Sequence, residues 1–237
     1  MRLSSPIYTL KREAKLLTRG TEIKLHQALD QVARREGFQD WGHLASSYGK
    51  TTPAKAILQQ LDAGDMALIA ARPGYGKTLL GLELVAMAGK SNRAAYFFTL
   101  SDTVPDIRNR LDKLGIDPDG FGRSVTIDTS DDICADHIIT RVDNTAKPAL
   151  ILVDYLQLLD QKRSNPPLDT QIRTLKAFAT AQGATVVLLS QIDRRFELSV
   201  KGMPSVDDIR LPNLVDLSLF DKRCFLHDGE IKVEQAA

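Results

Sequence analysis

The chain has 237 residues, of which 43% are hydrophobic and 26% are charged, and it carries a formal net charge of +1. This length suits one α/β domain with a small appendage, and the composition is that of an ordinary globular protein. The near balance of charge excludes a chain that is basic throughout, so any surface for nucleic acid has to be local.

Cysteine and histidine spacing does not predict a metal site. Cys134 and Cys224 lie far apart in the chain and form no C-x-x-C pair, which favours buried, reduced cysteines over zinc ligands. No apolar run reaches the ~18 residues of a membrane span, and the N-terminus lacks an apolar signal core. We expect a cytoplasmic protein that does not contact a membrane. The histidines show no ligand spacing either: they are His26, His43, His137 and His227.

Residues 1–50 are predicted to form a small bundle of three helices. Thr9, Thr21 and Asp40 are the expected N-caps, and Gly37 is expected to end the second helix. The segments "LKREAK" and "ARRE" place basic residues on the bundle surface. Such residues form either an ordinary solvated face or a DNA-contacting helical module, and the sequence leaves both interpretations open.

The remainder alternates between apolar strands and helices. A linker helix is expected within residues 51–63, and an α/β domain at 64–237. Strands that read as continuous apolar runs between helices indicate a mainly parallel sheet covered on both faces. We expect strands at 66–70, 94–100, 124–128, 149–154 and 184–191, and helices at 79–88, 106–114, 131–143 and 169–182.

The C-terminal segment is expected to add strands at one edge of the sheet. The run "LVDLSLF" at 214–220 is predicted to be a strand, and "RCFLHDGEIKV" a hairpin that turns at Asp228 and Gly229. Gly89 is expected to end the helix at 79–88.

The segment "ARPGYGKT" at 71–78 follows the phosphate-loop pattern G-x-x-x-x-G-K-[ST] except at its first position, where Ala71 replaces glycine. It lies between a predicted strand and a predicted helix, which is where backbone N–H groups and the helix dipole meet phosphates. Lys77 is expected to reach the phosphates, and the Thr78 hydroxyl to bind Mg²⁺. The expected nucleotide-binding residues are Ala71, Arg72, Pro73, Gly74, Tyr75, Gly76, Lys77, Thr78 and Leu79.

A second element of such a site is an acidic residue at the end of an apolar strand. The strand "ALILVD" ends at Asp154, about 75 residues after the loop. Its carboxylate is expected to hold Mg²⁺ together with Thr78. The alternative role is that of a helix cap or turn residue, and the pairing with the first motif favours the metal role.

Four segments together resemble the DnaB-type replicative helicases of superfamily 4, which have a RecA-like ATPase core. They are "AGDMALIAARPGYGKT", "ILVDYLQLLD", "LKAFATAQGATVVLLSQIDRRFE" and "PSVDDIRLPNLVDLSLF", in the family's order over about residues 60–222. The resemblance implies a RecA-like P-loop NTPase fold, and binding of ATP and Mg²⁺. It also implies a homo-oligomeric ring such as a hexamer, action on single-stranded DNA, and contact with replication proteins.

The resemblance also implies roles for single residues. Gln191 would sense the γ-phosphate and couple it to loops that face DNA. The catalytic set would comprise Lys77, Thr78, Asp154 and Gln191. The expected DNA-binding residues are Lys162, Arg163, Arg194, Arg195 and Lys201.

Two positions depart from the family pattern. Ser101 stands where the family has the glutamate that activates water, so Asp102 is the nearest substitute base. No Lys-x-Arg element appears at the place of the family's arginine finger, and Arg210 or the pair Lys222 and Arg223 are weaker substitutes. Three interpretations stay open: a DNA helicase or translocase, an ATP-binding accessory protein of DNA replication or of plasmid or phage maintenance that hydrolyses weakly, and a recombinase-like filament protein.

Overall fold

The computed structural model of the chain describes residues 4, 7–19, 23–50, 52–91, 93–142, 148–199, 201–211, 213–227 and 230–236. Two compact units are present, Met1–Ala56 and Ile57–Ala237, and each is described by itself. The division lies within the short helix α4 (Pro53–Leu58), which falls within residues 51–63, where a linker helix is expected.

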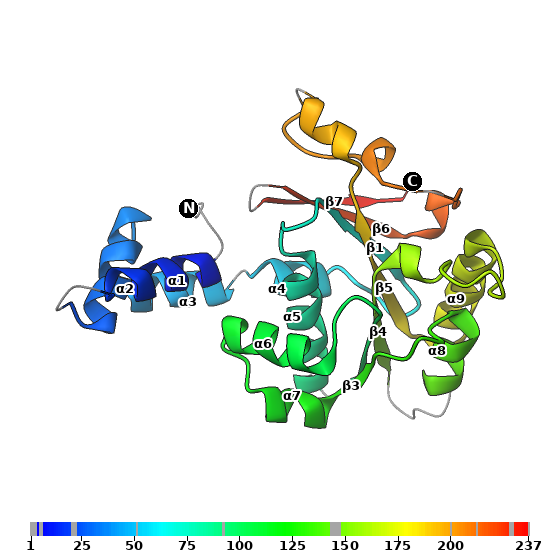
Figure 1. The fold of residues 1–237 in the computed structure, drawn as a ribbon, viewed down its shortest axis with the longest axis horizontal. Helices are drawn as coiled ribbons and strands as arrows, with labels where there is room; N and C mark the ends of the chain where they lie inside the picture. The colour runs from blue at the N-terminus through cyan, green and yellow to red at the C-terminus, as the bar shows by residue number, and fades with distance from the viewer. Residues whose placement is uncertain are drawn as a thin grey trace. The chain divides into compact units, whose positions relative to one another are not determined.

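The N-terminal unit contains three helices, α1 (Ile7–Leu17), α2 (Leu25–Arg35) and α3 (Trp41–Lys50) (Figure 1). Asp40 caps α3 as expected, because its Oδ1 accepts a hydrogen bond from the His43 N–H at 2.7 Å. Thr9 lies inside α1 and is not its cap, and Thr21 lies outside the described residues. The small core that holds the helices together consists of Leu10, Ala14, Ala28, Val32, Ala33, Phe38 and Leu44.

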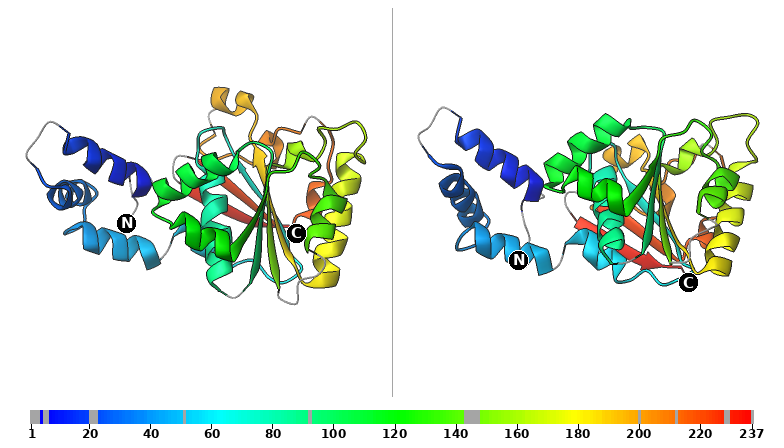
Figure 2. Two further views of the ribbon diagram at one scale, coloured as in Figure 1. Left: turned by 60° about the horizontal axis from the view of Figure 1, so that its bottom comes forward. Right: turned by 90° about the horizontal axis from the view of Figure 1, so that it is seen from below.

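The second unit is a three-layer α/β fold. Among the described residues, seven strands form one sheet in the order β3-β2-β4-β5-β1-β6-β7, with only β7 antiparallel to its neighbour. Helices α5, α6 and α7 lie on one face of the sheet and α8 and α9 on the other, which Figure 2 shows from two further directions. The strands are β1 (Met66–Ala71), β2 (Ala94–Thr99), β3 (Val125–Asp128), β4 (Ala149–Asp154), β5 (Thr185–Gln191), β6 (Lys222–His227) and β7 (Glu230–Gln235), and the helices are α5 (Lys77–Lys90), α6 (Val104–Leu114), α7 (Pro118–Ser124), α8 (Ala135–Val142) and α9 (Leu168–Gln182).

The expected α/β fold with a mainly parallel sheet is confirmed, and three local expectations are wrong. Gly89 lies inside α5, where it is needed for packing, because a Cβ there would lie 2.8 Å from the Ser124 carbonyl oxygen. Residues 214–220 form a 3₁₀ turn, η4 (Leu217–Leu219), because Asp216 caps the Ser218 N–H and ends any extended run. Helix α7 was not expected, since its sequence contains two glycines, and the carboxylate of Asp117 caps it. The hairpin of β6 and β7 is present, although its predicted turn at 228–229 lies outside the described residues.

The central strands are buried along their whole length. All six residues of β1 and all six of β4 are buried, as the continuous apolar runs in the sequence indicate. On the α8–α9 face the main polar anchor is Gln171, which is 1% exposed. Its Oε1 accepts from the Ala135 N–H at 3.0 Å, and its Nε2 donates to the carbonyls of Leu159 at 2.7 Å and Pro166 at 2.9 Å. Gln171 therefore ties α9 to the start of α8 and to the segment after β4.

Replacing Gln171 by leucine should lower the free energy of unfolding by about 2–4 kcal/mol, because two buried backbone groups and one partly buried carbonyl lose their partner at once. The matched control is Gln182→Leu at the exposed end of α9, which should stay within about 0.5 kcal/mol of the parent. Urea unfolding of the two variants measures the difference. Equal effects of the two changes would contradict the anchoring role of Gln171.

Candidate nucleotide site

Four parallel strands end at the same edge of the sheet. Register pairs Ala71 of β1 with Gln191 of β5, and Thr99 of β2 with Asp154 of β4. Strand β4 is also parallel to β5. The segments that follow these strands therefore meet, and they contain most of the residues that the sequence assigned to nucleotide binding and catalysis.

The loop after β1 has the backbone conformation that an anion site needs. Gly74 and Gly76 have φ angles of 87° and 82°, which residues with a side chain rarely adopt. Gly76 is the N-cap of α5, and no side chain caps the helix there. A Cβ placed on Gly74 would meet nothing within 4 Å. The first N–H groups of a 14-residue helix thus lie behind a loop with open space beside it, an arrangement that binds phosphate.

Lys77, Thr78 and Asp154 come together at this point. The Asp154 carboxyl interacts with the Thr78 side chain and with the positive charge of Lys77, and both interactions lower its pKa. The Lys77 ammonium lies 5.7 Å from the centre of the Tyr155 ring. Burial nevertheless raises the pKa of Asp154 above its ordinary value, since the residue is only 1% exposed.

One oxygen of Asp154, Oδ2, is buried and has no hydrogen-bond partner among the residues that the structure describes. Unsatisfied buried carboxylate oxygens are costly, and a bound cation or its water would satisfy this one. The donor set of one carboxylate and one hydroxyl suits Mg²⁺, which takes few protein ligands and keeps several waters. The residues present therefore fit the expected metal.

Gln191 lies at the end of β5, beside the loop after β1. Its Oε1 is 3.4 Å from a guanidinium nitrogen of Arg210, and its backbone carbonyl accepts from the Arg210 N–H at 2.8 Å. Gln157 joins the same group, since its Nε2 donates to the Ser190 hydroxyl at 3.0 Å. The side chain of Gln191 is thus held by Arg210 at the edge where the phosphates are expected.

Asp102, the expected substitute base, is already paired. Its two carboxylate oxygens accept from Nε and a terminal nitrogen of Arg110 at 2.7 and 2.8 Å, and Asp102 is 8% exposed. Asp154 interacts electrostatically with both partners, so the pair lies close to the Mg²⁺ site. The Ser101 hydroxyl is 3.2 Å from that of Thr99. A carboxylate held in a bidentate ion pair has both oxygens engaged, so it is not free to hold an attacking water.

Two residues of the phosphate loop point toward another loop. The Arg72 guanidinium is 8% exposed, donates to Glu197 Oε1 at 2.8 and 2.6 Å, and donates to the Ile192 carbonyl at 3.0 Å. The Tyr75 ring stacks on His227 at 5.2 Å, and Phe196 packs edge-on against the other side of that imidazole at 5.0 Å. Both contacts connect the phosphate loop to the 3₁₀ turn η2 (Arg194–Leu198) after β5.

This connection was missed in the sequence. The available signal was the acidic residue of the "DRRFE" segment, since a buried arginine in a phosphate loop needs a counter-charge. Arg110 was missed for a similar reason: its pairing with Asp102 spans the turn into α6 and shows in no short motif.

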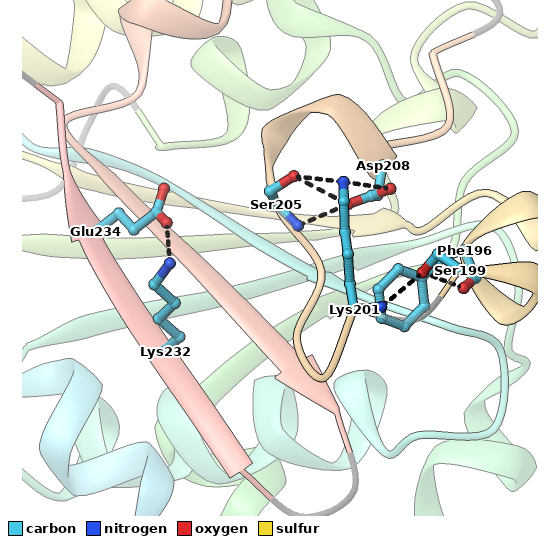
Figure 3. Close-up of polar contacts among 7 residues, drawn as sticks. All are labelled: Phe196, Ser199, Lys201, Ser205, Asp208, Lys232 and Glu234. Atoms are coloured by element: carbon cyan, nitrogen blue, oxygen red, sulfur yellow. Dashed lines mark hydrogen bonds and ion pairs between the residues drawn. The ribbon is translucent and has the colours of Figure 1, made fainter.

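Three of the five expected DNA-binding residues have ion-pair partners within the chain. Lys162 pairs with Asp132 at 2.6 Å, and Arg195 pairs with Asp193 at 3.2 Å. Lys201 lies against Asp208 and Ser205, with its Nζ 3.1 Å from Asp208 Oδ2 (Figure 3). Arg163 and Arg194 are exposed and have no ion-pair partner among the described residues. The loops after β4 and β5 therefore present less free positive charge than the sequence suggests.

The described residues contain no group of three or more His, Cys, Asp and Glu side chains that could hold a metal ion. Cys224 is buried, which raises the pKa of its thiol to about 12, whereas Cys134 is partly exposed, against the expectation that both are buried. No helix within the described part of the chain is long and apolar enough to cross a membrane.

Comparison with known proteins agrees with this geometry. Residues 122–216, which include Asp154 and Gln191, match the family model of the DnaB-like helicase C-terminal domain. A replicative DNA helicase DnaB of Mycoplasma genitalium is 26% identical over 199 residues, which is 69% of this chain and 42% of that protein. The second unit therefore resembles the DnaB-type helicases of superfamily 4 in sequence, most clearly over residues 122–216.

Comparison with solved structures shows a similar fold. A solved structure of a DnaB-like replicative helicase, studied with its interactions with primase, superposes with a TM-score of 0.60 at 19% identity, over 97% of this chain and 72% of that one. The DNA repair protein RadA of Mycobacterium tuberculosis is 26% identical over 142 residues, covering 56% of this chain and 28% of that protein. This chain spans less than half the length of these two curated relatives. Its ATPase unit has the RecA-like DnaB fold.

Replacing Asp154 by asparagine should change the stability of the protein and its affinity for ATP in opposite directions. The change removes a buried carboxylate with one unpartnered oxygen, so the nucleotide-free protein should become more stable at neutral pH by about 1 kcal/mol. Mg²⁺-dependent binding of ATP should fall by roughly tenfold or more, since the metal loses its charged ligand. Urea unfolding and fluorescence titration with a labelled ATP measure the two effects. Asp112→Asn on the exposed face of α6 is the control, and a large loss of stability in Asp154→Asn would contradict this account.

Glu197→Gln tests the connection between the phosphate loop and η2. Arg72 would keep a neighbour of the same size and shape but lose its counter-charge. ATP affinity should therefore fall by roughly tenfold, which corresponds to the energy of about one charge-assisted hydrogen bond. Asp207→Asn removes the same charge from an exposed position in the following loop and is the matched control. Equal affinities of the two variants would show that Arg72 needs no anchor.

Proposed function

We propose that this protein binds Mg²⁺-ATP at the carboxyl edge of β1, β2, β4 and β5, and that it is a DnaB-like DNA helicase or translocase ATPase. The observation that carries the proposal is the contact of Thr78 with Asp154 at the start of α5, with one oxygen of that buried carboxylate unsatisfied. Homology of the ATPase unit to DnaB helicases supports the class of activity. The proposed setting is DNA replication in the cytoplasm.

Each residue of the site has a proposed task. The backbone of residues 71–79 binds the phosphates through the N–H groups at the start of α5, while Lys77 contributes its charge. Thr78 and Asp154 hold Mg²⁺, which neutralises phosphate charge when bound. Gln191 contacts the γ-phosphate and is kept in place by Arg210. Arg72 and Tyr75, although part of the loop, serve mainly to fix it against η2.

The proposed polymer substrate is single-stranded DNA, and the proposed assembly is a homo-oligomeric ring such as a hexamer that contacts replication proteins. Support for both comes from similarity to the DnaB-type family. In the loops after β4 and β5, Arg163 and Arg194 are the stronger candidates for DNA contact. Lys162, Arg195 and Lys201 would first have to leave their carboxylate partners.

A second candidate is an ATP-binding accessory protein of DNA replication, or of plasmid or phage maintenance, that hydrolyses ATP weakly. The observation that favours it is the pairing of Asp102 with Arg110, together with Ser101 at the position of the base. Loss of a general base costs about 10²–10⁴-fold in rate. The recombinase-like filament has less support than either, since the matched family model describes a DnaB-like domain.

ATP turnover with and without single-stranded DNA distinguishes the two candidates. A motor should show DNA-stimulated turnover that Lys77→Ala abolishes, because the phosphates lose their main counter-charge. An accessory protein should bind ATP tightly and turn it over below about one per minute in both conditions. Ser101→Glu should then raise the rate by about tenfold or more, whereas Ser101→Gln, of similar size, should not. Absence of ATP binding in the parent protein would overturn both candidates.

A further inference from the structure

Charge is divided unequally between the two units. Residues 1–56 contain ten lysines and arginines and five acidic residues, whereas residues 57–237 contain twenty-one and twenty-five. The net charge of +1 is thus the sum of +5 on the small unit and −4 on the larger one. A local excess of positive charge on so small a unit creates a field that attracts polyanions.

The acidic groups of the N-terminal unit are used inside it. Glu13 pairs with Arg35 at 2.9 Å. Asp30 accepts from the Trp41 N–H at 2.9 Å, and Asp40 caps α3. Glu36 accepts from the backbone N–H of Ser4 at 2.6 Å. Each described carboxylate therefore has a partner within the unit, and Arg35 is the described basic residue that uses one of them in an ion pair.

Four basic residues of the unit are exposed and have no ion-pair partner in the described part of the chain: they are Lys11, Lys15, Arg19 and Lys24. Lys11 and Lys15 are one helical turn apart on α1, and Arg19 follows in the turn that continues it. The neighbouring Leu10 and Ala14 are buried at 1% and 0%, so the bundle core fixes which side of α1 is solvated. Lys24 immediately precedes α2.

Among the described residues of these helices, the exposed large apolar side chains are Leu16 of α1 at 50% and Leu25 of α2 at 44%, which are single residues on two helices and do not make a stripe along either one. Leu10 and Ala14 of α1 and Ala28, Val32 and Ala33 of α2 all lie in the core of the bundle. A helix that inserts into a lipid surface needs an unburied apolar stripe beside its basic one. The arrangement suits a ligand that needs charge contacts at regular spacing, and a phosphodiester backbone offers them.

We propose that the N-terminal unit binds nucleic acid through its phosphate backbone, using a basic face formed by Lys11, Lys15, Arg19 and Lys24. Contacts of this kind hold the polymer without reading its sequence. In the loops after β4 and β5, by comparison, three of the five expected cations are paired within the chain. The inference rests on the charges of this unit alone and does not require ATP hydrolysis.

The test measures binding of the full chain, without nucleotide, to a fluorescent 20-base-pair duplex and to a 20-nucleotide single strand across a salt series. The variant Lys11→Gln/Lys15→Gln/Arg19→Gln removes three charges. The control Lys90→Gln/Lys113→Gln/Arg123→Gln removes three exposed charges from the other unit. Anisotropy gives the affinity and its salt dependence, and thermal unfolding followed by circular dichroism checks that both variants are folded.

The first variant should bind at least one of the two DNA probes about tenfold or more weakly at low salt. Its slope of log K against log salt should be shallower by roughly 2.7 on duplex or 2.1 on single strand, because each lost phosphate contact removes about 0.9 or 0.7. Lys11→Arg/Lys15→Arg, which keeps the charge, should bind like the parent, and so should Lys77→Ala. The last result separates this inference from the proposed ATPase function.

Two results would overturn the proposal. The first is an unchanged affinity and salt slope in the folded triple variant on both DNA probes. The second is loss of binding to vesicles containing 30% phosphatidylserine while DNA binding stays at the level of the control, which would assign the basic face to an anionic lipid surface.

Discussion

The parallel pairing of β1, β5, β4 and β2 is the constraint on which the candidate site depends. Parallel strands that are neighbours end at the same edge, so residues separated by more than one hundred positions meet without any long-range motif to guide them. Because all six residues of β1 and of β4 are buried, a slip in register would disrupt close packing on both faces of the sheet and is disfavoured. The same packing that stabilises the sheet therefore fixes Thr78 against Asp154.

Charged residues in this molecule differ in whether they have an ion-pair partner, and this difference indicates which of them have a structural role and which a functional one. Asp102 and Arg110 neutralise one another, as do Arg72 and Glu197, so both pairs stabilise the geometry around the site. Asp154 keeps one oxygen unsatisfied in a buried place, a typical property of a functional carboxylate. The exposed lysines of α1 have no ion-pair partner within the described ranges of the chain, which suits attraction of a polyanion. The ion-pair partners of a charged residue thus indicate its role better than the sequence motif in which it occurs.

Local patterns predicted the fold well because the signals were local. Apolar runs identified the central strands, and β4 matches its predicted bounds at Ala149 and Asp154. Gly76, Lys77 and Thr78 were enough to predict the phosphate loop, since glycine permits the positive φ angle that the loop backbone needs. Pairings between side chains that are distant in the sequence, such as Arg72 with Glu197, could not be predicted. The sheet topology determines which of these side chains meet. The strand expected at 214–220 failed because an Asp216 cap outweighs apolar alternation.

The account's central claim is that one edge of the sheet binds Mg²⁺-ATP through the α5 N-terminus, Thr78 and Asp154. The most direct measurement is a crystal structure of the full chain with Mg²⁺ and a non-hydrolysable ATP analogue. We predict the phosphates within hydrogen-bond distance of the backbone of residues 74–78 and of the Lys77 ammonium, with Mg²⁺ at the Thr78 hydroxyl and near the Asp154 oxygen that now has no partner. Nucleotide bound at another place, or phosphates at this edge with Asp154 and Thr78 still in contact only with each other, would contradict it.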